Sequence, residues 1–153
     1  MDGVFLTADP QQLVLQGSVA NIPFITGDCD DEGTIFSFPN LNITLVYYLI
    51  ILTTLIYLPI SSTDAQLAEY LQMYWFPTAT AASIQELLTF YPQDPTQGSP
   101  YDTGDLNELS SQFKRIASLQ GDAVFQAPRR FFLQQRFYHQ NTWAFCESDS
   151  GTS

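Results

Sequence analysis

An uncharged stretch of 18 residues, 43–60 (ITLVYYLIILTTLIYLPI), restricts what this chain can fold into more than any other feature. As an α-helix it would be about 27 Å long, close to the roughly 30 Å hydrocarbon core of a bilayer. Its three tyrosines lie toward its two ends, as interfacial aromatic residues do. A transmembrane helix is therefore one interpretation. Two features oppose it, because no Lys or Arg flanks the stretch and Pro59 lies at its end.

The charge of the chain is strongly acidic and unevenly distributed. The formal net charge is −11 over 153 residues. The basic residues occur only late in the sequence, at Lys114, Arg115, Arg129, Arg130 and Arg136. Nucleic-acid binding requires clustered cations that neutralise phosphates, so no nucleic-acid partner is expected. Docking on anionic lipid is likewise unsupported.

Cysteine and histidine usage excludes the common metal sites. Cys29 and Cys146 allow either one disulfide or two free thiols, and the sequence leaves both open. There is one histidine and no Cys-x-x-Cys pair, so we expect no metal ion or cofactor. Residues 1–4 lack the basic-then-apolar pattern of a signal peptide, and the localisation stays open.

Hydrophobic periodicity predicts a chain of helices bracketed by strands. We expect helices at residues 11–17, 63–75, 81–90, 105–119 and 122–135, and strands at 22–26 and 141–145. Thr63 and Gln66 form a capping-box pattern at the start of one helix. Gly27 is expected to end the first strand, and Pro128 to bend or shorten the last helix. This order predicts an α/β layered fold with a long helical insertion between sheet strands.

The segment 21–36 (NIPFITGDCDDEGTIF) carries four carboxylates within the five positions 28–32. It resembles the part of fungal type B carboxylesterases and lipases that carries the acid of the catalytic triad. In that family a strand ends in Gly and an Asp-Glu-Gly-Thr/Ser turn follows. Further blocks resemble the same family in the same order, at residues 2–6, 41–44, 91–104, 112–116 and 121–133.

The resemblance implies a partial, incomplete α/β-hydrolase fold and a carboxylic ester hydrolase. By position Glu32 is the triad acid, whereas the flanking Asp30 and Asp31 are not assigned that role. A serine nucleophile needs a histidine base, and the base needs a carboxylate that fixes its tautomer and stabilises the imidazolium. The implied partner is an ester substrate. Without the resemblance, the turn would be interpreted as a solvated acidic loop.

The other members of the family's triad are missing from this sequence. No G-x-S-x-G elbow occurs, since Gly98-Ser99-Pro100 does not fit that pattern, and the oxyanion-hole glycines are absent. The resemblance places the base downstream of the strand at 141–145, whereas His139 precedes it and is expected to be a surface residue. The isolated chain is therefore expected to be inactive. A non-catalytic or membrane-anchored interaction protein derived from an esterase is the alternative.

The uncharged stretch interrupts the resemblance. Joining Thr44 to Thr63 gives a continuous family sequence, so residues 45–62 resemble an insertion. A translated intron is the interpretation we favour over a transmembrane helix. The expected organisation is an esterase segment at 1–44, the insertion at 45–62, a continued esterase segment at 63–146 and a disordered tail at 147–153. Asn42 begins a glycosylation sequon that is usable only in the secretory lumen. Family members are often secreted, and membrane contact would run through residues 43–60.

Overall fold

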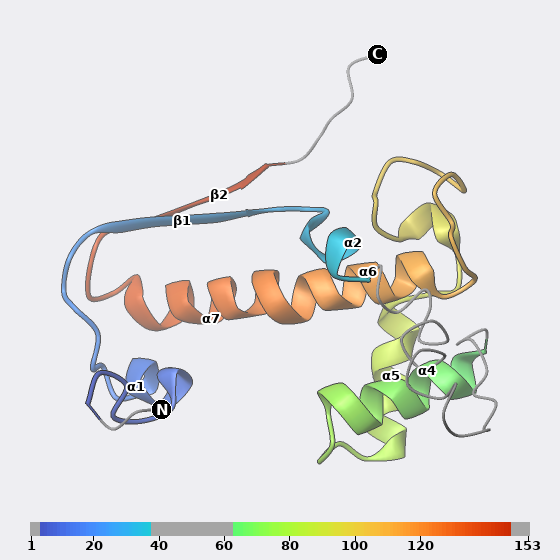
Figure 1. Ribbon diagram of the computed structural model, residues 1–153. Helices are drawn as coiled ribbons and strands as arrows, with labels where there is room; N and C mark the ends of the chain where they lie inside the picture. Colours follow the sequence, from blue (N-terminus) through green and yellow to red (C-terminus); the bar gives the residue numbers. More distant parts are fainter. Residues whose placement is uncertain (1–3, 38–62, 148–153) are drawn as a thin grey trace.

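The computed structural model describes residues 4–37 and 63–147 (Figure 1). The first range holds helix α1 (Pro10–Leu15), strand β1 (Phe24–Cys29) and helix α2 (Glu32–Ser37). The second begins with helix α4 (Asp64–Tyr70), π-helix η2 (Leu71–Trp75), helix α5 (Ala81–Phe90) and 3-10 helix η3 (Pro95–Gln97). It continues with helix α6 (Phe113–Gly121), π-helix η4 (Asp122–Gln126), helix α7 (Ala127–Arg136) and strand β2 (Thr142–Glu147).

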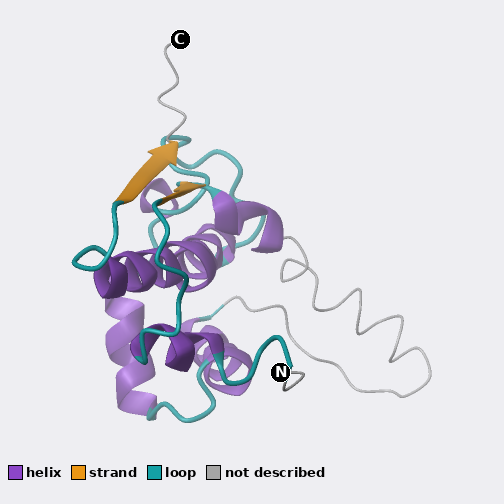
Figure 2. Cartoon of the chain, turned by 90° about the vertical axis from the view of Figure 1, so that its left-hand side faces the viewer, coloured by secondary structure: helices purple, strands orange, loops and turns teal. Residues whose placement is uncertain are grey.

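The two strands pair in parallel, from Phe24 opposite Thr142 to Cys29 opposite Glu147. Helix α7 runs along one face of this pair (Figure 1). The rings of Phe24 and Phe132 lie 4.8 Å apart between strand and helix. In the view of Figure 2 the strand pair lies above the helices. Helices with a parallel strand pair confirm the expected α/β class at this coarse level.

The first strand differs from its prediction in position and in burial. It was expected at residues 22–26 and to end at Gly27, but β1 continues through Gly27 to Cys29. A Cβ on Gly27 would lie 2.4 Å from the ring of Phe145, so this glycine admits an aromatic ring from β2 rather than ending the strand. The strand was expected to be buried, yet its outer face leaves Ile25 68% exposed.

Helix α6 lies at the centre of the helical part, and all of its residues are buried. The amphipathic helix expected at 105–119 is wrong in its first half, because α6 begins only at Phe113 and Leu106 is 69% exposed. Asn107 adopts φ 62°, which a helix does not allow. The buried Lys114 amine donates to the carbonyl of Gly104, so the chain there forms turns.

The helix expected at 122–135 is present and continues α6 as one rod through η4 and α7 (Figure 1). Pro128 lies in the first turn of α7, directly after the π-helical segment. The proline lacks an N–H and crowds the preceding turn, and the widened π-turn accommodates both effects. Helix α7 runs on past Pro128 to Arg136, so the expected shortening is not observed and the expected bend stays a prediction.

The apolar core joins α4, η2, α5 and α6. Its buried members are Leu67, Leu71, Ile84, Leu88, Ile116 and Leu119. The predicted capping box is confirmed: the Gln66 amide donates to the Thr63 hydroxyl over 3.3 Å, and the Thr63 amide donates to the Gln66 side chain over 3.2 Å. Helix α5 matches its predicted limits, with Thr80 as its N-cap.

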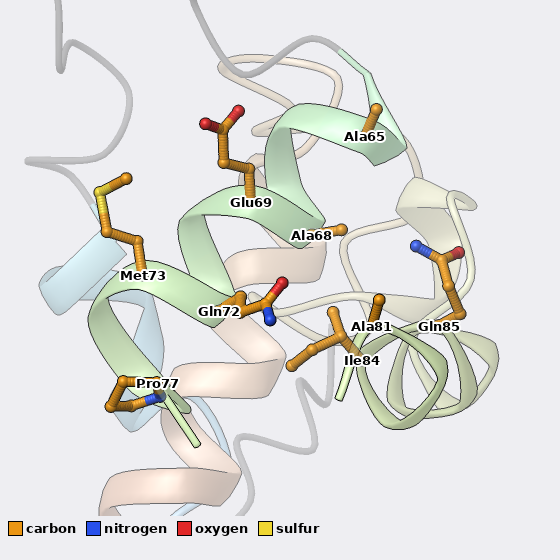
Figure 3. A pocket seen from close by; sticks show the side chains of 9 residues that line it. All are labelled: Ala65, Ala68, Glu69, Gln72, Met73, Pro77, Ala81, Ile84 and Gln85. Carbon is orange, nitrogen blue, oxygen red and sulfur yellow. The ribbon is translucent and has the colours of Figure 1, made fainter. Parts of the chain in front are cut away.

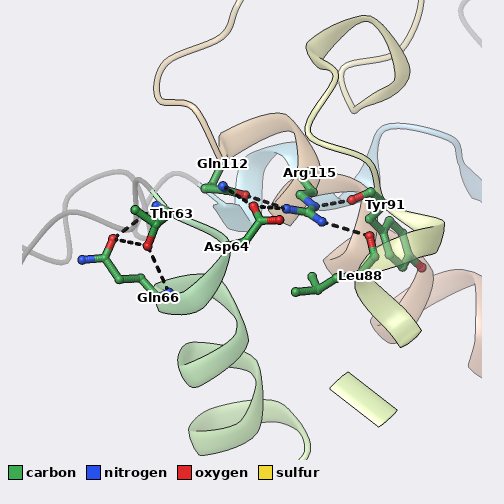
Figure 4. A network of polar contacts seen from close by, with 7 residues as sticks. All are labelled: Thr63, Asp64, Gln66, Leu88, Tyr91, Gln112 and Arg115. Atoms are coloured by element: carbon green, nitrogen blue, oxygen red, sulfur yellow. Dashed lines mark hydrogen bonds and ion pairs between the residues drawn. The ribbon is translucent and has the colours of Figure 1, made fainter. Parts of the chain in front are cut away.

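A buried arginine of α6 binds the end of α5 and the start of α4 (Figure 4). Arg115 donates to the carbonyl of Leu88 over 2.9 Å and to that of Tyr91, both at the end of α5. Its third contact is an ion pair of 2.7 Å with Asp64, which begins α4. Gln112 donates to the same carboxylate over 3.2 Å. Arg115 thus supplies a donor to the Tyr91 carbonyl and a second donor to the Leu88 carbonyl, which also accepts from the Tyr91 amide.

Within residues 4–37 and 63–147, no helix is long and apolar enough to cross a membrane. The uncharged stretch 43–60, the insertion 45–62 and the sequon at Asn42 lie outside the described residues, as does the tail from residue 148.

Candidate functional site

The acidic turn lies where both parallel strands end. The Asp30 amide donates to the Glu147 carbonyl over 3.1 Å, which joins the turn to the last residue of β2. Glu32 follows β1 by three positions and begins α2. Its Oε1 accepts from the Cys29 amide over 3.2 Å, and its side chain is half-buried. Glu32 therefore occupies a helix start at the carboxyl edge of the strand pair, not an irregular loop.

Two of the four carboxylates in this region are fixed to other elements. Asp28 is buried under the sheet and forms a 2.7 Å ion pair with Arg129 of α7. Asp31 Oδ1 accepts from the Ser99 hydroxyl over 2.7 Å and from the Tyr101 amide over 2.8 Å. Asp28 and Asp31 are therefore bound by residues of other elements, whereas the Glu32 side chain accepts from the Cys29 amide of its own turn.

Desolvation and like charges raise the pKa of two groups in the turn. Partial desolvation and the neighbouring Asp31 raise the pKa of Asp30 above its usual value. Desolvation, Glu32 and Glu147 raise the pKa of the Cys29 thiol. Cys29 and Cys146 are both free and exposed, which resolves the open disulfide question. The raised pKa lowers the thiolate fraction of Cys29 near neutral pH.

Helix α2 is held against α6 by a backbone-to-backbone contact. A Cβ on Gly33 would lie 1.9 Å from the Ala117 carbonyl oxygen and 2.4 Å from the Gly121 nitrogen. The buried Ser37 hydroxyl contacts the Gly33 carbonyl and the Gln120 side chain, each over 2.8 Å. The helix that begins with Glu32 is therefore seated on the central helix of the fold.

Ser99 is a residue of this site that sequence reasoning missed. Its sequence pattern, Gly98-Ser99-Pro100, does not fit a nucleophile elbow and indicates no other role. Its hydroxyl is 1% exposed and lies 2.6 Å from that of Thr34, in addition to its bond with Asp31. Its amide donates to the Ser118 hydroxyl of α6 over 2.9 Å. The only available signal was its position in the family-like block 91–104.

His139 is a surface residue, as expected. It is exposed and precedes β2, whereas Glu32 follows β1. In a parallel pair these positions are at opposite ends of strands of six residues, roughly 20 Å apart. His139 is therefore not the base for Glu32.

A shallow apolar groove of about 630 Å³ lies between α4–η2 and α5 (Figure 3). It is lined by Ala65, Ala68, Glu69, Gln72, Met73, Pro77, Ala81, Ile84 and Gln85. None of these residues belongs to the acidic turn. Across the described part of the chain, no His, Cys, Asp and Glu side chains gather into a metal-binding group.

The chain is an α/β protein in which a parallel strand pair carries a helix on one face and the acidic turn at its carboxyl edge, where sites of parallel sheets are expected. No family model matches the sequence. Fungal lipases do match it. Lipase 4 of Diutina rugosa is 44% identical over 132 residues, 86% of this chain and 21% of the relative. Secreted lipase 1 of Botryotinia fuckeliana is 37% identical over 99% of this chain and 24% of the relative. A secreted triacylglycerol lipase of Gibberella zeae is 38% identical over 87% of this chain and 20% of the relative.

These matches confirm the resemblance to fungal lipases, and the chain is homologous to a segment of that family. It spans about a fifth to a quarter of the length of the curated relatives it matches.

Proposed function

We propose that this chain supplies the triad acid, Glu32, of a serine-dependent carboxylic ester hydrolase, as part of an α/β-hydrolase fold. The observation that carries the proposal is the position of Glu32 at the carboxyl edge of a parallel strand pair. Active-site groups of open parallel sheets lie at that edge. Asp28 is paired with Arg129 and Asp31 is bound by Ser99 and Tyr101, whereas Glu32 is held by the Cys29 amide of its own turn. The family-like turn assigns the role to Glu32 and not to Asp30.

In the proposed chemistry Glu32 accepts a hydrogen bond from the imidazole of a histidine. The carboxylate fixes the tautomer and stabilises the imidazolium that forms when the serine attacks the ester carbonyl. The bond between the Asp30 amide and the Glu147 carbonyl supports a base that follows β2, since that strand ends beside the turn. The serine and the oxyanion donors come from polypeptide outside this chain, because its sequence holds no G-x-S-x-G elbow.

The proposed substrates are esters of carboxylic acids, including triacylglycerols. This proposal rests on the names of the relatives, all of which are lipases and one of which is a triacylglycerol lipase.

In the experiment the full chain replaces the matching segment of Secreted lipase 1 of Botryotinia fuckeliana. That segment aligns with 99% of the chain. We call the resulting protein the exchange lipase. We expect it to hydrolyse triacylglycerol and to lose kcat by roughly 10⁴-fold in Glu32→Gln. A second variant exchanges only residues 24–37, in case the larger exchange does not fold. A folded, active exchange lipase that is indifferent to Glu32→Gln would refute the proposal.

A non-catalytic interaction module is the second candidate. It is favoured by the outer face of the strand pair, where Ile25, Trp143 and Phe145 are 53–68% exposed. Parallel sheets are normally covered on both faces. Ile25→Lys and Trp143→Glu should then abolish association of the chain with other polypeptide, while Glu32→Gln leaves it unchanged.

A further inference from the structure

We infer that Asp31 and Ser99 are positioning residues that orient the Glu32 carboxylate. The inference rests on the proposed role of Glu32 as a triad acid, and it concerns residues with no proposed contact to substrate. It is carried by hydrogen bonds from Ser99, more than 60 positions later in the sequence, to side chains on both sides of Glu32.

The donor and acceptor of each hydrogen bond of Ser99 Oγ can be assigned. Ser99 Oγ has one hydrogen, which it donates to Asp31 Oδ1 over 2.7 Å. The 2.6 Å contact with Thr34 is therefore a bond in which the Thr34 hydroxyl donates to Ser99 Oγ. Asp31 precedes Glu32 and Thr34 follows it by two positions, so one buried hydroxyl holds both ends of the short segment that carries the acid.

Ser99 is itself held in place by the core. Ser99 is 1% exposed, and its amide donates to Ser118 Oγ over 2.9 Å. Ser118 lies on the buried helix α6 and donates to the Lys114 carbonyl over 3.1 Å. Asp31 Oδ1 also accepts from the Tyr101 backbone amide over 2.8 Å, which adds a second donor to the same oxygen. The segment around Glu32 is therefore joined to the buried helix α6 by a series of hydrogen bonds.

Both hydrogen bonds to Asp31 end on the same oxygen. Substitutions at this position can therefore separate a role as hydrogen-bond acceptor from a role of the negative charge. Asn at position 31 retains one carbonyl oxygen and can accept both bonds, whereas Ala accepts neither. A positioning role predicts that Asp31→Asn is tolerated and Asp31→Ala is not. A role for the negative charge predicts that both variants fail equally.

The first arm of the test needs no catalysis and uses the full chain. The Cys29 amide donates to Glu32 Oε1, so its NMR chemical shift reports whether the Glu32 side chain is in place. We expect this chemical shift to be retained in Asp31→Asn and in the control Asp30→Ala. In Asp31→Ala and in Ser99→Ala it should move toward the position seen in Glu32→Ala, which lacks the acceptor. A Cys29 chemical shift that is unchanged in Asp31→Ala would overturn the inference, whatever the fate of the proposed function.

The second arm uses the exchange lipase. We expect Asp31→Ala to lower kcat by about 100-fold with KM unchanged, the size of loss that a misplaced catalytic group produces. Asp31→Asn should restore kcat to within about threefold. In a Glu32→Gln background, Asp31→Ala should cause no further loss, because Asp31 acts through Glu32. A further loss in that background would show a general structural role and refute the inference. Indifference to Glu32→Gln itself would instead refute the proposed function.

Discussion

Gly33→Ala is the substitution that most sharply tests how the acid-bearing helix is seated. The added Cβ would lie 1.9 Å from the Ala117 carbonyl oxygen and 2.4 Å from the Gly121 nitrogen. Both obstacles are backbone atoms of the rod that begins with α6, so no side-chain rotation relieves them. Helix α2 must move away by more than about 1 Å to restore a normal contact.

The energetic balance of Gly33→Ala has two opposing parts. Overpacking costs typically about 1–3 kcal/mol, and a backbone obstacle places this case near the upper end. Alanine gains about 1 kcal/mol over glycine in helix propensity. We therefore expect a net loss of about 2 kcal/mol in the free energy of unfolding.

Urea unfolding of the full chain, followed by tryptophan fluorescence, measures this loss. The matched control is Gly104→Asn, because Gly104 has open space around it and φ 59°, which asparagine tolerates. The control should stay within about 0.5 kcal/mol of the original chain. If Gly33→Ala left the chain equally or more stable, the close packing of α2 on α6 would be refuted.

Three further predictions follow from separate parts of the structure. Arg115→Met should cost about 3 kcal/mol of unfolding free energy, because it removes the donor of the Tyr91 carbonyl and one of the two donors of the Leu88 carbonyl. Asp64→Ala should cost about 1 kcal/mol or less, since that side chain is 55% exposed; equal costs in urea unfolding would contradict the description of this network. The folded pKa of Asp30 is raised above 3.8, so stability attributable to it is present at low pH and lost as pH rises through the folded pKa. Asp30→Asn should therefore raise the urea midpoint at pH 7 and leave it unchanged well below pH 3.8, and a lowered midpoint at pH 7 would be the contrary result. The 153-residue chain alone should not hydrolyse short-chain nitrophenyl esters, and turnover that disappears in Glu32→Gln would disprove this.

Local sequence signals predicted those elements whose cause is itself local. Helix α5 matched because Thr80 caps it and its apolar residues recur at helical spacing. The capping box at Thr63 matched for the same reason. The helix expected at 105–119 is absent over its first half. Its apolar residues do recur at helical spacing, but Asn107 and the Lys114 contacts to the preceding loop favour turns there.

The acidic turn could be found from the sequence, but its organisation could not. Glu32 was assigned by the family-like turn around it, and this assignment stays a prediction. Which carboxylates of the turn are paired depends on partners far along the chain. Arg129 pairs with Asp28 across 101 positions, and Ser99 with Asp31 across 68. No local pattern encodes such pairings, because they arise only when β1 and α2 pack on the rod that begins with α6.

An amide scan of the four carboxylates between positions 28 and 32 in the exchange lipase tests the central claim most directly. The measurement is kcat on triacylglycerol for Asp28→Asn, Asp30→Asn, Asp31→Asn and Glu32→Gln. Our account predicts a loss of roughly 10⁴-fold for Glu32→Gln alone and losses below about 100-fold for the other three. A loss of that size at Asp30 or Asp28, with Glu32→Gln still active, would contradict the assignment of Glu32 as the triad acid.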